Sequence, residues 1–100
     1  MPYLAGRIAN APFKPENLSR PAVDYLKLFY FDTAVQGNTA NLMCANAFCG
    51  TGRQVFGTDF PMASADLVKE TIASIQRMTV ADADKQAILD SNARRLLKLE

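Results

Sequence analysis

The chain of 100 residues contains no histidine. Histidine is the usual general base near neutral pH and a common metal ligand, so its absence excludes a histidine-dependent catalytic triad and a metal centre built from imidazoles of this chain. The G-x-G-x-x-G, P-loop, G-x-S-x-G and C-x-x-C motifs are absent as well. The sequence therefore carries no signature of nucleotide binding, serine hydrolysis or thiol redox chemistry.

An excess of charge of either sign is also lacking. Eleven Lys and Arg against ten Asp and Glu give a formal net charge of +1, so no long-range field should attract nucleic acid or an anionic membrane. No apolar run approaches the roughly 20 residues that span a bilayer, and the N-terminal residues do not resemble a secretory signal. We therefore expect a cytoplasmic protein with neither nucleic-acid nor membrane partners.

Cysteine is scarce, with Cys44 and Cys49 five residues apart on one expected helix. At 3.6 residues per turn this spacing separates them by about 140° around the helix axis, so they point to different faces. We expect two reduced, packed thiols. The alternative, a redox or metal pair, would require the helix to bring them together and further ligands to join them.

Local patterns predict an α/β fold in which helices alternate with two parallel strands. Residues 1–18 should form an irregular or loosely helical lead-in. The expected helices cover 19–28 with Ser19 as cap, 37–50, 64–77 with Ser64 as cap, 81–89 and 92–97, and the expected strands cover 29–31 and 55–58. The side chains expected to face the core are Ala40, Met43, Ala47, Phe48, Val68, Ile72, Ile75, Leu96 and Leu97. Two parallel strands leave both outer sheet edges unpaired, so residues 1–100 predict a single partial domain.

The segment Val55–Pro61 places a carboxylate, Asp59, at the end of a short apolar strand. Functional groups collect at the carboxyl ends of parallel strands, which makes Asp59 the first candidate for a functional residue. The simpler alternative is that its side chain accepts local backbone amides and forms a turn before the next helix.

Three runs, in this order, carry a resemblance to a known family: Phe29–Ala34, Phe56–Pro61 and Asn92–Leu97. Together with Pro2–Ile8 they resemble the C-terminal part of amidohydrolase-related (β/α)8 barrels, in particular the aminocarboxymuconate-semialdehyde decarboxylase group. The resemblance covers nearly the whole chain and implies the last quarter of a barrel, with strands seven and eight and four or five helices.

The resemblance also implies roles for two residues. Asp59 matches the aspartate at the end of the eighth strand, which binds a divalent metal, commonly zinc. Arg7 matches an arginine that some decarboxylases of the group offer to a substrate carboxylate across a subunit interface; without the resemblance it would be an ordinary exposed side chain. Asp32 matches a position at the end of the seventh strand and is most simply a turn residue. The family's His-x-His pair, its later histidines and its first six strands have no counterpart here.

Two hypotheses follow. In the first, the chain is a C-terminal fragment of a metal-dependent hydrolase or decarboxylase acting on a small carboxylated or aromatic compound. It would be inactive alone, with no complete catalytic set and no metal of its own, because one aspartate cannot hold a catalytic ion. Its partners would be the remaining barrel segments. In the second, the chain is a non-catalytic module that covers its sheet edges by self-association.

Overall fold

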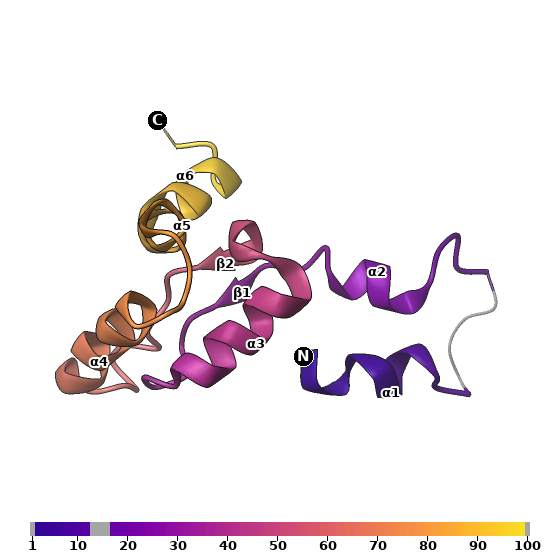
Figure 1. The fold of residues 1–100 in the computed structure, drawn as a ribbon, viewed down its shortest axis with the longest axis horizontal. Helices are drawn as coiled ribbons and strands as arrows, with labels where there is room; N and C mark the ends of the chain where they lie inside the picture. Colours follow the sequence, from indigo (N-terminus) through magenta and orange to yellow (C-terminus); the bar gives the residue numbers. More distant parts are fainter. Residues whose placement is uncertain (1, 13–16, 100) are drawn as a thin grey trace.

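The computed structural model describes residues 2–12 and 17–99, and two short parallel strands lie at its centre (Figure 1). They are β1 (Phe31–Asp32) and β2 (Gln54–Val55). The paired residues are Phe31 with Gln54 and Asp32 with Val55. Within the described residues each strand has a neighbour on one side only. The expected α/β architecture is therefore confirmed, as an open piece of a sheet.

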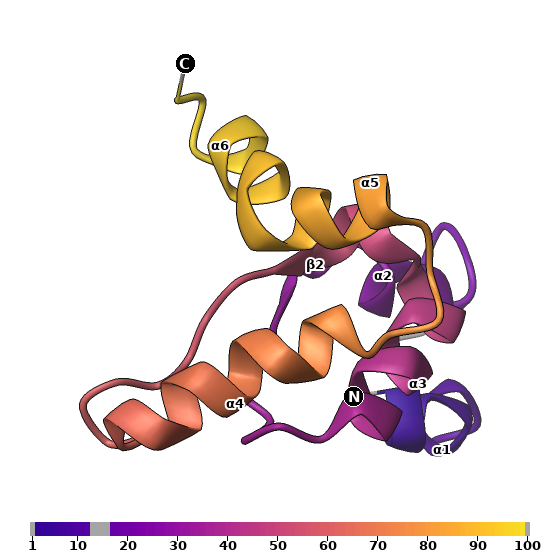
Figure 2. The same ribbon diagram turned by 60° about the vertical axis from the view of Figure 1, so that its left-hand side comes forward.

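Helices pack around this sheet on several sides. In Figures 1 and 2, α3 lies on one side of the strands, and α5 and α6 lie beside β2. The α1–α2 pair projects away from the rest of the chain (Figure 1). The helical elements are η1 (Pro2–Leu4), α1 (Ala5–Ala9), α2 (Ala22–Leu26), α3 (Thr39–Cys49), η2 (Thr51–Arg53), α4 (Ala65–Gln76), α5 (Asp82–Gln86), η3 (Ala87–Ser91) and α6 (Asn92–Leu96). None of the helices in these described ranges has the length and apolar character to cross a lipid bilayer.

The core forms where α3, α4 and the C-terminal helical stretch meet. Its buried members are Leu42, Ile75, Met78 and Ile88, with Phe56 among the partly buried side chains around them. On α4, Ile75 faces the core as expected, whereas Val68 and Ile72 are only partly buried. On α3 the expected face was only partly right: Met43 packs against the core, but Ala40 and Ala47 are exposed. The fully buried residue of this helix is Leu42.

The position of the first strand differs from the prediction. The run Phe29–Phe31 was expected to be a strand because aromatic residues favour sheets. In the structure the amide of Phe29 donates to the carbonyl oxygen of Leu26, so the turn that ends α2 includes Phe29, which is 56% exposed. Pairing starts only at Phe31. The second strand is likewise shorter and earlier than the expected 55–58.

A capping side chain begins each of the two longest helices, and the cap expected at Ser64 is confirmed. The side chain of Asn38 accepts the amide of Asn41, and that of Ser64 accepts the amide of Leu67, so each satisfies a free donor at a helix start. Gly50, at φ +77°, ends α3. Ser19 does not cap α2: its hydroxyl bonds the Tyr25 hydroxyl over 2.6 Å, and the helix begins at Ala22.

The C-terminal helices form one continuous stretch and do not restart at Asn92. α5 passes through a π-helical turn, η3, directly into α6. Asn92 is buried in this stretch, while Leu96 and Leu97 are 42% and 64% exposed. The expectation that these two leucines point inward is therefore wrong for this chain, in which the described residues leave that face of α6 uncovered.

Candidate functional site

The two strands end at the same edge of the sheet because they are parallel. β1 ends at Asp32, and Asp59 follows the last residue of β2 by four positions. A side chain joins the segments beyond the last backbone pair. The hydroxyl of Thr33 donates to the carbonyl oxygen of Gly57 over 2.9 Å and accepts from the Gly57 amide over 3.1 Å. The sheet edge that carries the candidate acids is thus held together by a fully buried threonine.

Glycine at position 57 allows the two segments to approach closely. A Cβ atom at Gly57 would lie 3.1 Å from Cβ of Asp32, which is tighter than ordinary contact. The Asp32 carboxylate itself accepts the amide of Ala34 over 2.9 Å, so the prediction that Asp32 forms a strand-end turn is confirmed. A larger residue at position 57 would require Asp32 to shift.

The Asp59 backbone is held by a hydrogen bond, whereas its carboxylate bonds none of the other described residues. Its φ of +62° lies in the left-handed region, which aspartate tolerates better than most residues. Its carbonyl oxygen accepts the amide of Ala63 over 2.8 Å, and Ala63 is buried. The local turn bond that sequence reasoning assigned to Asp59 belongs to Thr58, whose hydroxyl accepts the amide of Phe60 over 3.3 Å. No hydrogen bond or ion pair to another described residue engages the exposed Asp59 carboxylate.

Arg7 lies on α1 and is exposed. The views in Figures 1 and 2 place α1 at the opposite end of the molecule from the start of α4, the helix that follows the Asp59 segment. This chain therefore does not bring Arg7 and Asp59 together.

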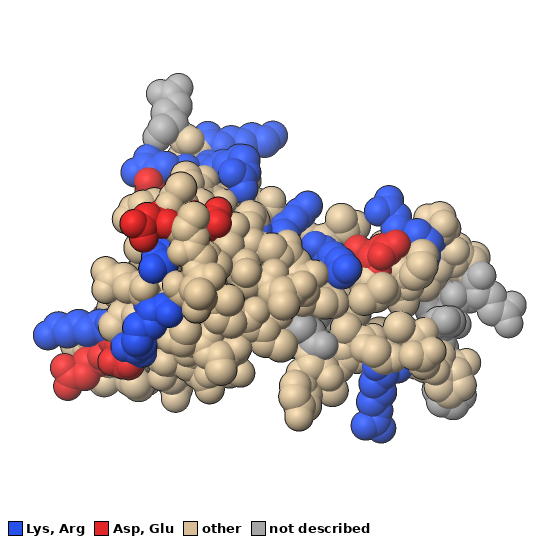
Figure 3. All heavy atoms as spheres, viewed as in Figure 1, with Lys and Arg blue, Asp and Glu red and all other residues tan. Residues whose placement is uncertain are grey.

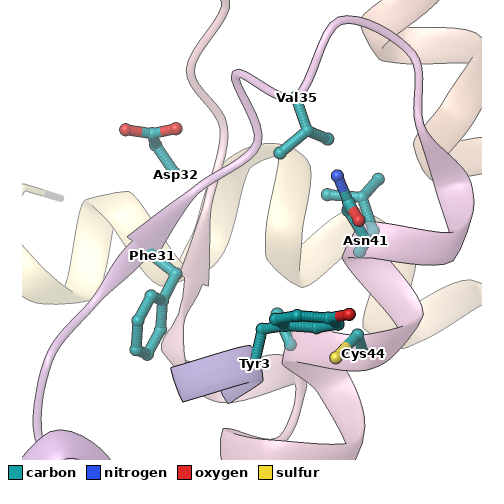
Figure 4. Close-up of a pocket in the computed structure, with 8 residues that line it drawn as sticks. Tyr3, Phe31, Asp32, Val35, Asn41 and Cys44 are labelled. Atoms are coloured by element: carbon teal, nitrogen blue, oxygen red, sulfur yellow. The ribbon is translucent and has the colours of Figure 1, made fainter. Parts of the chain in front are cut away.

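A pocket that sequence reasoning missed lies between β1 and α3, with Tyr3 of η1 at its rim (Figure 4). Its volume is about 320 Å³. Phe31 and Tyr3 lie on one side, Val35 and Asn41 lie on the other, and the Asp32 carboxylate points away from the pocket (Figure 4). No local sequence signal predicts it, because it depends on η1 folding back onto α3.

Cys44 also lines this pocket and is exposed, so the expectation that it is packed was wrong. Cys49 is half-buried, and its thiol donates to the carbonyl oxygen of Ala45 over 3.1 Å. Burial raises the pKa of Cys49, an effect that nearby Arg53 partly offsets. The two thiols occupy different surroundings, as their spacing on the helix predicts.

The donor set available for a metal ion is small. Across the described residues, no group of three or more His, Cys, Asp or Glu side chains could hold an ion. A catalytic zinc site needs about three protein ligands. Asp59 could fill one ligand position, because its carboxylate is exposed and bonds none of the other described residues, but a metal site would need further ligands from outside this set.

Comparison with known proteins gives a consistent result. The chain is 31% identical over 97 residues to 6-methylsalicylic acid decarboxylase of Penicillium expansum, a match that covers 93% of this chain and 30% of the relative. It superposes with a TM-score of 0.79 and 28% identity on a dihydroxybenzoic acid decarboxylase of Polaromonas sp. JS666 that contains manganese and the inhibitor 2-nitroresorcinol. That match covers 97% of this chain and 30% of the solved one.

The same fold occurs in a protein assigned as an amidohydrolase from Staphylococcus aureus, with a TM-score of 0.83 over 99% of this chain and 32% of that one; at 21% identity this likeness concerns the fold alone. The chain matches, in sequence and in fold, one part of the amidohydrolase-fold decarboxylases. The resemblance read from the sequence is thereby confirmed. This chain spans about 30% of the length of these decarboxylases, and no protein-family model matches it. The open sheet edges are those of a piece of the (β/α)8 barrel of this family.

Proposed function

We propose that the chain is the part of a metal-dependent decarboxylase that supplies barrel strands seven and eight. In this assignment residues 1–100 form one partial domain, with β1 as strand seven and β2 as strand eight. The substrate would be a small hydroxylated aromatic acid, of the kind on which the Penicillium and Polaromonas relatives act according to their names. The observation that carries the proposal is the free carboxylate of Asp59 on a fixed backbone at the strand ends.

Asp59 would be one ligand of a divalent cation. The family resemblance favours zinc, and manganese, the ion in the Polaromonas structure, is the alternative that metal analysis would distinguish. Such an ion acts as a Lewis acid toward substrate oxygens. Decarboxylation breaks the bond between the ring carbon and the carboxylate, releases carbon dioxide and leaves the ring carbon to take up a proton. Because this chain contains no histidine, we assign the proton donor to the other strands of the barrel.

Arg7 would bind the carboxylate of a substrate that lies in the active site of a neighbouring subunit. Its exposure on α1, away from the strand ends, suits a group presented outward. A guanidinium pairs with a carboxylate through two parallel hydrogen bonds, so it would orient the acid group as well as attract it.

The test requires these 100 residues joined to the other strands, for example by exchanging them for the matching segment of the Polaromonas decarboxylase. We call this protein the complete barrel. Release of carbon dioxide from dihydroxybenzoic acids should depend on added divalent metal and should be lost in Asp59→Ala. The control is Asp66→Ala, because Asp66 is exposed in the first turn of α4. Turnover that survives Asp59→Ala, or that needs no metal, would contradict the proposal.

Self-association of the chain alone is the second candidate, and exposed apolar side chains favour it. An uncharged area lies over α3 near the centre of the molecule (Figure 3). Large apolar residues more than half exposed are Tyr3 at 94%, Met62 at 83%, Phe60 at 65%, Leu97 at 64%, Leu99 at 58% and Phe29 at 56%. Either the missing barrel or further copies of this chain would cover them. Sedimentation of the isolated chain over a wide concentration range tests this candidate, which a compact monomer would exclude.

A further inference from the structure

We infer that Thr33 is a positioning residue that holds the segment carrying Asp59, an inference that rests on the proposed role of Asp59 as a metal ligand. The backbone ladder between the strands ends at the pair Asp32 and Val55. Beyond that pair, the Thr33 hydroxyl both donates to and accepts from the backbone of Gly57, over 2.9 and 3.1 Å. The Thr33 side chain thus takes the place of the next backbone pair of the sheet, at Gly57, two residues before Asp59.

The Thr33 hydroxyl lies in a buried environment. Thr33 is 0% exposed, so water cannot replace its hydroxyl as the partner of Gly57 without a rearrangement of the surroundings. The β-branched side chain has few rotamers, which keeps the oxygen in one place. Gly57 also lies close to Asp32, the residue before Thr33, since an added Cβ would lie 3.1 Å from Cβ of Asp32.

Asp59 is held from both directions along the chain. On its N-terminal side the Thr33–Gly57 contact fixes the strand end. On its C-terminal side its carbonyl oxygen is bonded to the amide of buried Ala63. Between these two anchors the residue has φ +62° and its carboxylate is exposed. A metal ligand needs this combination, because an ion selects ligands whose positions are set before it binds.

Removing the hydroxyl should therefore weaken metal binding without removing any ligand. We expect Thr33→Val in the complete barrel to lower the affinity for Mn²⁺, measured by calorimetric titration of the metal-free protein, by roughly tenfold or more, the usual effect of losing a group that orients a ligand. Thr33→Ser keeps the hydroxyl and should bind Mn²⁺ within a few-fold of the parent protein.

The matched control is Thr71→Val. Thr71 is also buried, at 1% exposure, and its hydroxyl also donates to a carbonyl oxygen over 2.9 Å, but this partner is Leu67 within α4. Both valine variants should lose thermal stability in the metal-free state, whereas only Thr33→Val should lose Mn²⁺ affinity. An equal affinity for the two valine variants would show that Thr33 has a structural role only and would overturn the inference.

Two further variants separate a failure of the proposed function from a failure of the inference about Thr33. Asp59→Asn should abolish tight Mn²⁺ binding; if it does not, the proposed function fails, and the inference about Thr33 fails with it. If Asp59→Asn abolishes binding while Thr33→Val leaves it unchanged, only the inference fails. If Thr33→Val does not fold, Gly57→Ala takes its place, because its methyl group would lie 3.1 Å from Cβ of Asp32 and would require a shift where the same two segments meet. Parent-like Mn²⁺ affinity in Gly57→Ala would then overturn the inference.

Discussion

Asn92 joins the C-terminal helical stretch to the turn before β2, and its replacement gives the most specific stability prediction. It is 1% exposed. Its side-chain amide donates to the carbonyl oxygens of Thr51 over 2.7 Å and Gln54 over 2.8 Å, and its carbonyl oxygen accepts from Arg95 over 3.0 Å. Three parts of the chain therefore depend on one side chain of suitable shape.

Asn92→Leu keeps the approximate volume and removes all three hydrogen bonds. The Gln54 carbonyl would remain buried without a donor, which costs about 1–3 kcal/mol. The bond to Thr51 would add about 1 kcal/mol, and Arg95, which is exposed and retains the Gly52 carbonyl at 3.3 Å, would add little. The free energy of unfolding should fall by about 3 kcal/mol in sum. For a domain of this size that corresponds to a decrease in Tm of about 12–24 °C.

Thermal unfolding followed by circular dichroism at 222 nm measures the effect, with Asn10→Ala as the control. Asn10 also donates its side-chain amide to a carbonyl oxygen, that of Gly6, over 2.8 Å, but it does so on the surface. Exposed substitutions usually change stability by less than about 0.5 kcal/mol, so the control should melt within a few degrees of the parent chain. A Tm of Asn92→Leu equal to that of the control would refute the view that burial makes this asparagine important.

Two further predictions concern packing and thiol chemistry. Ile75→Asp should abolish cooperative unfolding, because it places a charge at a core position of 0% exposure, while Lys69→Asp on the exposed face of α4 should change Tm by a few degrees at most; equal melting of the two variants would show that the assigned face is wrong. Burial raises the pKa of Cys49, so iodoacetamide at pH 8 should alkylate exposed Cys44 first, as followed by tandem mass spectrometry. The folded chain retains the Cys49 proton longer than the unfolded chain does, so this thiol's contribution to stability should be lost as pH rises above the ordinary thiol range of about 8.5; faster alkylation of Cys49 would contradict the assignment.

Local sequence signals were sufficient to place the helices that begin at a capping side chain. Asn38 before α3 and Ser64 before α4 each bond an amide three residues later, and such short-range contacts can be read from sequence. The strand boundaries could not, since the aromatic run at Phe29 favours a sheet while its amide closes the turn after α2. Whether Phe29 joins a strand or the turn after α2 depends on where β2 lies in the fold.

The site was only partly predictable for a related reason. Asp59 could be proposed as a functional residue because a carboxylate after an apolar strand is a local pattern, and the family resemblance pointed to the same residue; its role stays a prediction. Thr33 could not, because its partner Gly57 is 24 residues away. The role of Asn92 depends likewise on Gln54, 38 residues earlier. No local sequence signal tells whether a polar side chain at the end of a strand bonds a distant segment or forms a local turn.

The most direct test of the central claim, that this chain supplies one ligand to a metal site completed elsewhere, is calorimetric titration of the chain alone with zinc and with manganese, beside the complete barrel. We expect no stoichiometric site tighter than about micromolar, or about 8 kcal/mol, in the chain alone, and one such site in the complete barrel. A tight stoichiometric site in the chain alone would contradict the account, because a single free carboxylate at Asp59 cannot form it.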